Sequence, residues 1–237
     1  MRLKNQVVII TGASRGLGQA MALLFGKEGA HIIAASRTSS EIEHTAEQIR
    51  DHGGSALAIP TDITDLAQVS DLFRRVEEDY GKIDILINNA GIGLFGSVEE
   101  LTPEALDQML AVNVKGTVYC CQAAFKRMKE ARSGHIINIL STASKVGRAN
   151  ESGYTASKWA QAGFTESLKA EAKPFGIRVT SFCPGGMNTP FWQTPENQAH
   201  QQQAEQFMNP QAIAELLLHI ATFPAAINID DIVVKRM

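Results

Sequence analysis

The stretch VVIITGASRGLG, residues 7–18, decides the fold of this chain. Its apolar, β-branched start predicts a buried strand, and Gly12, Gly16 and Gly18 follow at once, before a helical pattern that runs to about residue 28. Such glycines let the backbone turn sharply and let a pyrophosphate approach the N-terminus of the helix, where unpaired N–H groups and the helix dipole favour an anion. The spacing G-x-x-x-G-x-G differs from the usual G-x-G-x-x-G dinucleotide fingerprint. Two interpretations are therefore open: a phosphate-binding loop, and a plain glycine turn between a strand and a helix.

The same alternation of strand and helix continues outward along the chain. Short apolar runs lie at 7–10, 31–35, 56–59, 83–87, 135–140, 177–182 and 229–234. Stretches of helical period separate them, at 16–28, 40–52, 65–80, 103–131, 153–173 and 210–222. The third of these stretches has one apolar face, formed by Leu66, Val69, Leu72, Phe73 and Val76. This alternation predicts an α/β fold, a doubly wound parallel sheet of about seven strands with helices on both faces. Because these elements occupy the whole length, we expect residues 1–237 to form a single domain.

The composition excludes several classes of protein. The chain has 237 residues, 44% apolar and 20% charged, which is enough apolar surface for a core and argues against disorder. A net charge of -3 lacks the basic excess that nucleic-acid-binding domains carry. No apolar stretch reaches the roughly 18 residues of a membrane span, and the first apolar run is too short for a signal-peptide core. We therefore expect a cytoplasmic protein with no nucleic-acid or membrane partner.

The three cysteines do not form a metal site or a disulfide framework. Cys120 and Cys121 are adjacent, and Cys183 is far away in the sequence, so the spacing of a ligand cluster is missing. Free cysteine behaves as a small hydrophobic residue, and we expect all three to be buried thiols.

A segment at about 188–208 differs from the rest in being rich in glutamine and poor in large apolar residues. It follows the carboxyl end of a predicted strand, where α/β folds place their functional loops. It reads as an insertion, and two interpretations stay open: a solvated surface loop and a substrate lid.

The end of the second predicted strand bears on the choice of cofactor. A dinucleotide site for NAD places a carboxylate about 20 residues after the glycine loop, on the ribose 2′-hydroxyl. This chain has Ser36 and Arg37 there instead, with Arg15 in the glycine loop. A guanidinium pairs well with a phosphate, so the two arginines favour NADP(H) over NAD through its 2′-phosphate.

A set of polar residues suggests acid–base chemistry. Tyr154 and Lys158 are four residues apart on a predicted helix and so share a face. A nearby ammonium favours the phenolate and should lower the pKa of the tyrosine, which then serves as an acid or base near neutral pH. Ser141 is expected at the carboxyl end of a strand, with a hydroxyl that can donate to a carbonyl oxygen. Asn113 lies in mid-helix, where its poor propensity predicts a kink or a polar role.

Together these motifs resemble the short-chain dehydrogenase/reductase family, in its short single-domain subclass and NADP-preferring type. The family's motifs occur in order over essentially the whole chain, as T-G-x-x-x-G-x-G from Thr11, N-N-A-G from Asn88, Asn113, Ser141, Y-x-x-x-K from Tyr154, and P-G at Pro184 and Gly185 followed by Thr189. The resemblance implies a Rossmann-like fold, a homo-oligomer (dimer or tetramer), and roles for single residues.

Tyr154 would be the acid/base, Lys158 would also bind the nicotinamide ribose, Ser141 would orient the substrate carbonyl, and Asn113 would hold a water in a proton relay. Asp62 would bind the adenine edge. The full set that the resemblance and the glycine loop assign to the cofactor is Gly12, Ser14, Arg15, Gly16, Leu17, Gly18, Ser36, Arg37, Asp62, Ile63, Asn89, Ala90, Gly91, Tyr154, Lys158, Pro184, Gly185, Met187 and Thr189.

These expectations combine into an NADP(H)-dependent oxidoreductase that interconverts a carbonyl and a secondary alcohol, either similar to a 3-oxoacyl reductase or a general carbonyl reductase. Phe95, Phe191 and Trp192 are expected on the wall of the substrate site, where they either line an apolar pocket or serve as packing anchors. Arg148 is expected on the same wall, either solvated or facing an acidic substrate group. A protein that binds NADP as a sensor or scaffold, without catalysis, is the alternative. An epimerase or dehydratase of the extended subclass is disfavoured, because such enzymes need a further substrate domain.

Overall fold

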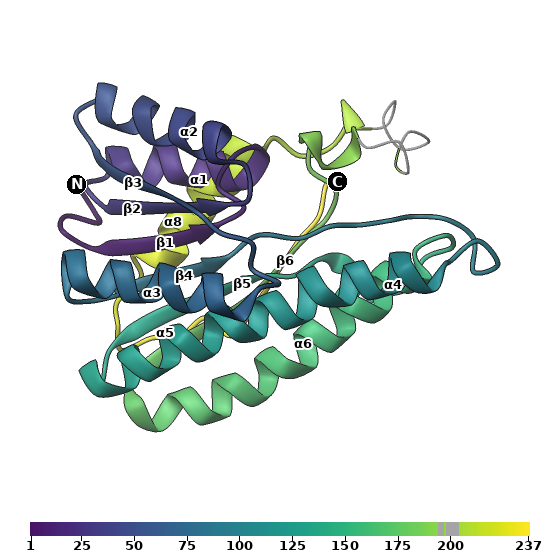
Figure 1. Ribbon diagram of the computed structural model, residues 1–237. Coiled ribbons are helices and arrows are strands. Elements are labelled where there is room, and N and C mark those ends of the chain that lie inside the picture. The colour runs from purple at the N-terminus through teal and green to yellow at the C-terminus, as the bar shows by residue number, and fades with distance from the viewer. Residues whose placement is uncertain (194–196, 198–203) are drawn as a thin grey trace.

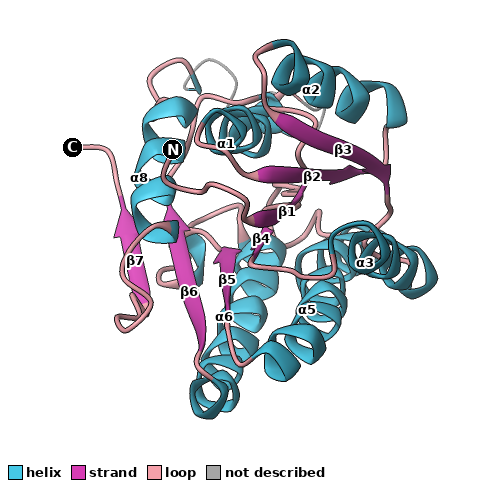
Figure 2. Ribbon diagram, turned by 90° about the vertical axis from the view of Figure 1, so that its left-hand side faces the viewer, coloured by secondary structure: helices cyan, strands magenta, loops and turns pink. Residues whose placement is uncertain are grey.

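The computed structural model describes residues 1–193, 197 and 204–237. Its centre is a seven-stranded parallel sheet of order β3-β2-β1-β4-β5-β6-β7 (Figure 1; β7 is labelled in Figure 2). The strands are β1 (Val7–Thr11), β2 (His31–Ser36), β3 (Ser55–Pro60), β4 (Ile85–Asn88), β5 (Gly134–Ile139), β6 (Ile177–Pro184) and β7 (Asp231–Val234).

Helices cover both faces of this sheet, as the alternation predicts (Figure 2). On one face lie α1 (Gly16–Lys27), α2 (Ser39–Asp51) and α8 (Pro210–Ala221); on the other lie α3 (Leu66–Tyr80), α5 (Thr117–Ala131) and α6 (Ser152–Ala172). Each face has its own apolar core, the first centred on Phe25 and Leu217 and the second on Leu72 and Met128. The predicted three-layer, Rossmann-like α/β fold is confirmed.

The strand order places a crevice beside β1. Ile9 pairs with Ile33 of β2 on one side and with Leu86 of β4 on the other. The chain winds from β1 toward β3 and then returns to β4, so the order reverses between β1 and β4. In open α/β sheets, ligands bind at such a point, outside the carboxyl ends of the strands.

The inner strands are buried on both faces, as the continuous apolar runs predict, but the two edge strands, β3 and β7, are not. In β7 the residues alternate between exposed and half-buried, because Ile232 and Val234 pack against the core on the α8 face while Asp231 and Val233 point to the opposite, uncovered face. The strand is also shorter than expected: it begins at Asp231, not at residue 229.

Two expectations about helices need correction. Leu66 is 53% exposed and does not join the buried face of α3, because it is the first residue of that helix and its side chain lies before the first packed turn. The stretch 103–131 is not one uniform helix: α4 (Pro103–Leu110) is followed by a π-helical turn, Ala111–Gly116, and then by α5. The π turn contains Asn113, so the irregularity predicted there is confirmed.

The ends of the 188–208 segment are held together. The backbone N–H of Asn188 donates to the carbonyl of Met208 at 2.9 Å, and the N–H of Met208 donates to the carbonyl of Gly186 at 3.1 Å. Pro190–Trp192 form a short 3-10 helix. The interior of this segment, residues 194–196 and 198–203, lies outside the described residues, so the choice between a loop and a lid stays open.

All three cysteines are buried free thiols, as predicted. In the described part of the chain, no helix has the length and hydropathy that crossing a bilayer requires.

Candidate functional site

A cavity of about 290 Å³ opens at the carboxyl ends of the central strands. It brings together most of the residues that the sequence singled out, although they come from positions 12 to 192. Ser141, Tyr154 and Lys158 line it, and so does every predicted cofactor residue except Gly18. Two of the predicted site residues, Asn113 and Gly18, stand behind its wall instead.

The glycine loop forms one end of the cavity. Gly12 and Gly16 have φ of 65° and 58°, the left-handed region that favours glycine. A Cβ on Gly18 would lie 2.1 Å from the carbonyl oxygen of Gly12, so α1 packs against the loop at a distance that only glycine allows. Within the described chain, no side chain caps the N-terminus of α1. Its first N–H groups therefore stay available for an anion, which favours the phosphate-binding interpretation over a plain turn.

The N-N-A-G segment fastens β4 to this loop. The Thr11 hydroxyl oxygen accepts from the backbone N–H groups of Asn89 and Ala90, each at 3.0 Å. The Asn89 amide donates in return to the carbonyls of Thr11 and Gly12, at 3.0 and 3.1 Å. The side-chain amide of Asn89 thus holds the glycine loop in place.

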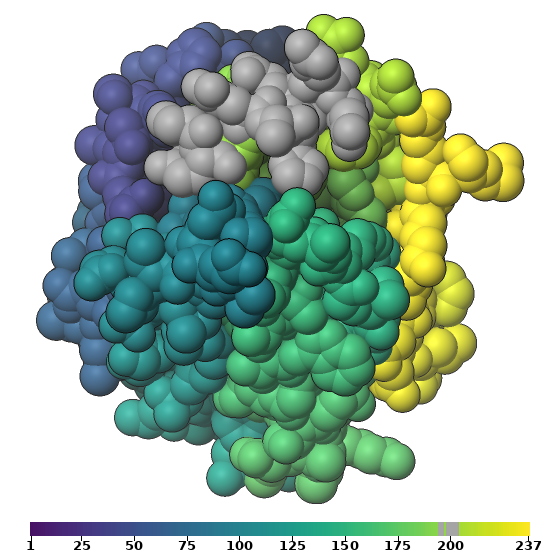
Figure 3. All heavy atoms as spheres, turned by 90° about the vertical axis from the view of Figure 1, so that its right-hand side faces the viewer, coloured from purple at the N-terminus to yellow at the C-terminus, as the bar shows by residue number. Residues whose placement is uncertain are grey.

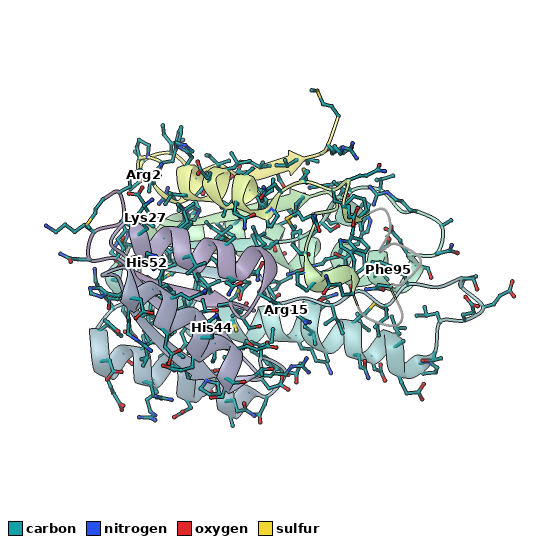
Figure 4. The ribbon with its side chains drawn as sticks, turned by 90° about the horizontal axis from the view of Figure 1, so that it is seen from above. Arg2, Arg15, Lys27, His44, His52 and Phe95 are labelled. Carbon is teal, nitrogen blue, oxygen red and sulfur yellow. The ribbon has the colours of Figure 1, made fainter. Side chains whose placement is uncertain are left out.

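The two arginines lie at the cavity as predicted. Arg15 precedes α1 and Arg37 follows β2; both are exposed and line the cavity beside Ser36. Neither forms an ion pair with a described carboxylate, and no acidic residue follows β2 directly. In Figure 4, Arg2, Lys27 and His52 lie at one end of the molecule. Arg15 lies nearer the centre, and Phe95 lies toward the other end.

Tyr154 and Lys158 lie one turn apart on α6, and both are buried. The Lys158 Nζ is 5.9 Å from the centre of the Tyr154 ring. Burial raises the pKa of Tyr154 to about 12, an effect that a hydrogen bond with Ser141 only partly offsets. Burial also lowers the pKa of Lys158 to about 7. The predicted lowering of the tyrosine pKa by the lysine is therefore wrong for this state of the protein, because desolvation of the phenolate outweighs a cation that is itself desolvated.

Ser141 lies two residues beyond β5, in extended backbone. Its hydroxyl oxygen accepts from the N–H of Ala143 at 3.1 Å and so caps the short 3-10 helix Thr142–Ser144. This contact fixes the oxygen at the cavity and leaves the hydroxyl proton able to donate toward Tyr154 or a bound carbonyl oxygen.

Asn113 is fully buried and acts as a clamp. Its side-chain oxygen accepts from the N–H of Ile92, and its amide donates to the carbonyl of Ile92 and to the hydroxyl of Ser157, each at 2.9 Å. The π turn is thereby tied to the loop after β4 and to α6. The water relay assigned to Asn113 stays a prediction.

The other end of the cavity is aromatic, as expected. The Phe95 ring stacks on Trp192 with centroids 5.5 Å apart and an interplanar angle of 17°. Phe191 lies 6.2 Å from the Tyr154 ring, centre to centre. In Figure 3 the teal surface of the segment after β4 adjoins the green surface of the segment that leads into α6. The N–H of Gly96 donates to the carbonyl of Asn150 at 3.0 Å.

Two polar groups stand beside these rings. Arg148 donates to the Thr142 hydroxyl at 3.0 Å and pairs with Glu151 at 3.4 Å, and all three line the cavity. Sequence reasoning considered Arg148 and missed Glu151, whose only signal is its place three residues before Tyr154.

Comparisons with known proteins identify the family of this chain. Residues 6–200 match the family model described as short chain dehydrogenase. The chain belongs to the short-chain dehydrogenase family. An uncharacterised oxidoreductase of Staphylococcus aureus strain MW2 is 33% identical over 233 residues, 98% of each chain. A sepiapterin reductase of Chlorobaculum tepidum is 33% identical over 238 residues, 98% of this chain and 96% of that protein.

A solved structure extends the likeness to three dimensions. The crystal structure of a metagenomic short-chain oxidoreductase in complex with NADP superposes with a TM-score of 0.87 at 30% identity, covering 100% of this chain and 99% of that one. This short-chain dehydrogenase is thus an oxidoreductase by family, and its cavity lies outside the carboxyl ends of the central strands, where open α/β sheets bind ligands.

Proposed function

We propose that the protein is an NADP(H)-dependent oxidoreductase that interconverts a carbonyl and a secondary alcohol, with Tyr154 as the acid/base. The observation that carries this proposal is the meeting of Ser141, Tyr154 and Lys158 on the wall of one cavity whose far end is the glycine loop. A proton donor, a hydroxyl that orients an oxygen, and a cation are thereby placed around one space. Residues 1–237 then act as a single domain that supplies both the cofactor site and the substrate site.

The residues present fit a dinucleotide. Gly12 and Gly16 line the cavity in left-handed backbone, and Gly18 lets α1 pack directly against that loop. The uncapped N-terminus of α1 beside them suits a pyrophosphate. Arg15 and Arg37 would hold a 2′-phosphate, and the NADP in the related metagenomic structure supports that choice. When bound, the nicotinamide supplies or accepts the hydride.

The side chains of this chain supply the rest of the chemistry. Ser141 orients the substrate oxygen by donating its hydroxyl proton, and Tyr154 delivers a proton to the developing alkoxide or removes it in the reverse direction. The high pKa of Tyr154 keeps its proton in place until negative charge develops next to it. Protonated Lys158 stabilises the phenolate left behind by proton transfer.

The test uses a panel of ketones and aldehydes with NADPH and NADH side by side. We expect NADPH oxidation by the parent chain, and a Tyr154→Phe variant that keeps NADPH binding but loses about 100-fold or more in kcat. Tyr80→Phe is the matched control, because that tyrosine lies at the end of α3 and packs on His31. Unchanged kcat in Tyr154→Phe would overturn the assignment. Tight NADPH binding with no oxidation across the panel would favour a sensor or scaffold.

Homo-oligomer formation, as a dimer or tetramer, is proposed from the family alone, and analytical ultracentrifugation of the full chain tests it. A monomer at micromolar concentration would contradict it.

A further inference from the structure

A buried hydrogen-bond chain runs behind the cavity, from Lys158 into the protein. The Lys158 ammonium donates to the side-chain oxygen of Gln161 at 2.8 Å and to the carbonyl of Ile139 at 3.2 Å. The Gln161 amide nitrogen donates to the Thr117 hydroxyl at 2.9 Å, and that hydroxyl donates to the main-chain carbonyl of Asn113 at 2.9 Å. Lys158, Gln161 and Thr117 are each 3% exposed or less.

The direction of each bond in this chain is determined by its far end. The carbonyl of Asn113 can only accept, so the Thr117 hydroxyl gives its proton there and presents its oxygen to Gln161. The Gln161 amide must then turn its NH₂ toward Thr117 and its oxygen toward Lys158. The uncharged side-chain oxygen of Gln161 thus faces the buried ammonium of Lys158. Two of the three ammonium N–H groups are used in the described hydrogen bonds, which leaves one for a molecule in the cavity.

We propose that Gln161 is a positioning residue for Lys158: it holds the ammonium at the cavity wall, and Thr117 and the Asn113 carbonyl hold Gln161. This proposal rests on the proposed function for the meaning of Lys158, but the hydrogen-bond chain itself is independent of any substrate. The π turn therefore supports the site in two ways. The Asn113 side chain bonds to Ile92 and Ser157, and the Asn113 carbonyl accepts the last hydrogen bond of the series that begins at Lys158.

The hydrogen bond from Lys158 to Gln161 affects whether the lysine is protonated. Lys158 lies in a dry environment, which disfavours its protonated form. A hydrogen bond to an uncharged oxygen favours that form, and such bonds to charged groups are among the stronger ones in proteins. The titratable groups that face Lys158 are Tyr154 on the same helix and Cys183 on β6; β5 presents only the Ile139 carbonyl.

The test is a pH titration of Lys158 in the full chain, monitored by NMR of lysine side chains labelled with ¹³C at Cε. The resonance is assigned by its absence from Lys158→Met. In Gln161→Met, which keeps the side-chain volume, we expect the titration midpoint to fall by about one pH unit or more, because the charged form loses an acceptor. In Gln161→Glu we expect it to rise, because a carboxylate replaces the neutral oxygen.

Thr117 offers a matched pair of variants. Thr117→Val keeps the shape and removes the hydroxyl, so the midpoint should fall, whereas Thr117→Ser keeps the hydroxyl and should restore the parent value. A midpoint in folded Gln161→Met that matches the parent would overturn the proposal. If Gln161→Met does not fold, equal midpoints in Thr117→Val and Thr117→Ser would overturn it equally. The titration needs no cofactor or substrate, so failure of the carbonyl panel leaves its outcome unaffected.

Discussion

The ring of Phe95 meets the ring of Tyr154 edge-on, with centroids 5.3 Å apart and an interplanar angle of 77°. One face of Phe95 stacks on Trp192, so Phe95 lies between Tyr154, the proposed acid/base, and the aromatic end of the cavity. Edge-to-face contacts of this kind stabilise a ring in one orientation. A substrate whose oxygen reaches Tyr154 therefore has an apolar surface next to its carbon substituents.

Replacing Phe95 with alanine should reduce kcat/KM for bulky apolar ketones by roughly 10-fold or more, because an apolar contact between the ring and the substrate is worth about 1–3 kcal/mol. Small ketones that do not reach Phe95 should lose less. Steady-state kinetics on a homologous series of ketones measures the ratio. Phe125→Ala is the control, since Phe125 packs on Phe175 within the α5 side of the core. Equal losses for small and bulky ketones would contradict this role.

Arg15 and Arg37 together predict a preference for NADPH over NADH. Loss of one guanidinium–phosphate contact should weaken NADPH binding by about 10- to 100-fold in Arg15→Ala and in Arg37→Ala, with little change for NADH. Calorimetric titration with each cofactor measures the two affinities. Arg74→Ala serves as the control, because Arg74 pairs with Asp71 and Glu78 on the exposed face of α3. A parent chain that binds NADH more tightly than NADPH would contradict the argument.

The contact between Gly18 and Gly12 predicts a steric effect. In Gly18→Ala the new methyl group would also lie 2.6 Å from the Asn89 amide nitrogen, so both the loop and the N-N-A-G segment must move. We expect a loss of about 1–3 kcal/mol in the free energy of unfolding, together with weaker cofactor binding.

Gly163→Ala is the matched control for that substitution. Gly163 is an exposed glycine inside α6, and a Cβ there meets no atom within 4 Å. Alanine should raise the free energy of unfolding by about 0.5–1 kcal/mol, because it restricts the unfolded chain and suits a helix. Urea unfolding measures both. A neutral Gly18→Ala would show that the loop is not as closely packed as the structure has it.

Burial of Lys158 predicts a dependence of stability on pH. The pKa of Lys158 is about 7 in the folded protein, below the ordinary 10.5. Between these two pH values the unfolded chain binds more protons at this lysine than the folded protein does. The contribution of Lys158 to the free energy of unfolding therefore rises with pH. Its full destabilisation of the folded protein applies below about pH 7. Lys158→Met should therefore gain stability relative to the parent at pH 6 by up to roughly 4 kcal/mol more than at pH 10.

Urea unfolding of both proteins across this range checks the prediction. Lys126→Met, which removes an exposed lysine on α5, is the control for loss of a lysine as such. Parallel stability curves for Lys158→Met and the parent would show that the buried ammonium carries no such penalty.

Local patterns predicted much of the fold. β-branched runs and helical periods located the strands and the helices, because parallel strands buried on both faces and amphipathic helices each leave a direct signature. The boundaries were less accurate: β5 ends at Ile139, which leaves Ser141 two residues beyond it. Leu66 is exposed because it precedes the first packed turn of α3, and β7 is short and partly exposed at the edge of the sheet; a local pattern carries neither kind of information.

The site shows the same division. The motifs predicted that Ser141, Tyr154 and Lys158 act together, and the cavity brings them together. They did not predict that Asn113 and Gly18 stand behind the wall, or that Glu151 lines it. Gln161 went unnoticed because an uncharged residue three positions after a lysine is common in helices, and only its burial beside Thr117 makes it part of the site.

The sequence by itself determined the order of strands and helices, the glycine loop, the two arginines and the spacing of Tyr154 and Lys158. These features follow from local chemistry: backbone freedom at glycine, charge, and the pitch of a helix. Only the tertiary structure decided the proton affinities in the site. Desolvation depends on every group packed around a charge, and it raises the pKa of Tyr154 and lowers that of Lys158, against the expectation from their spacing alone.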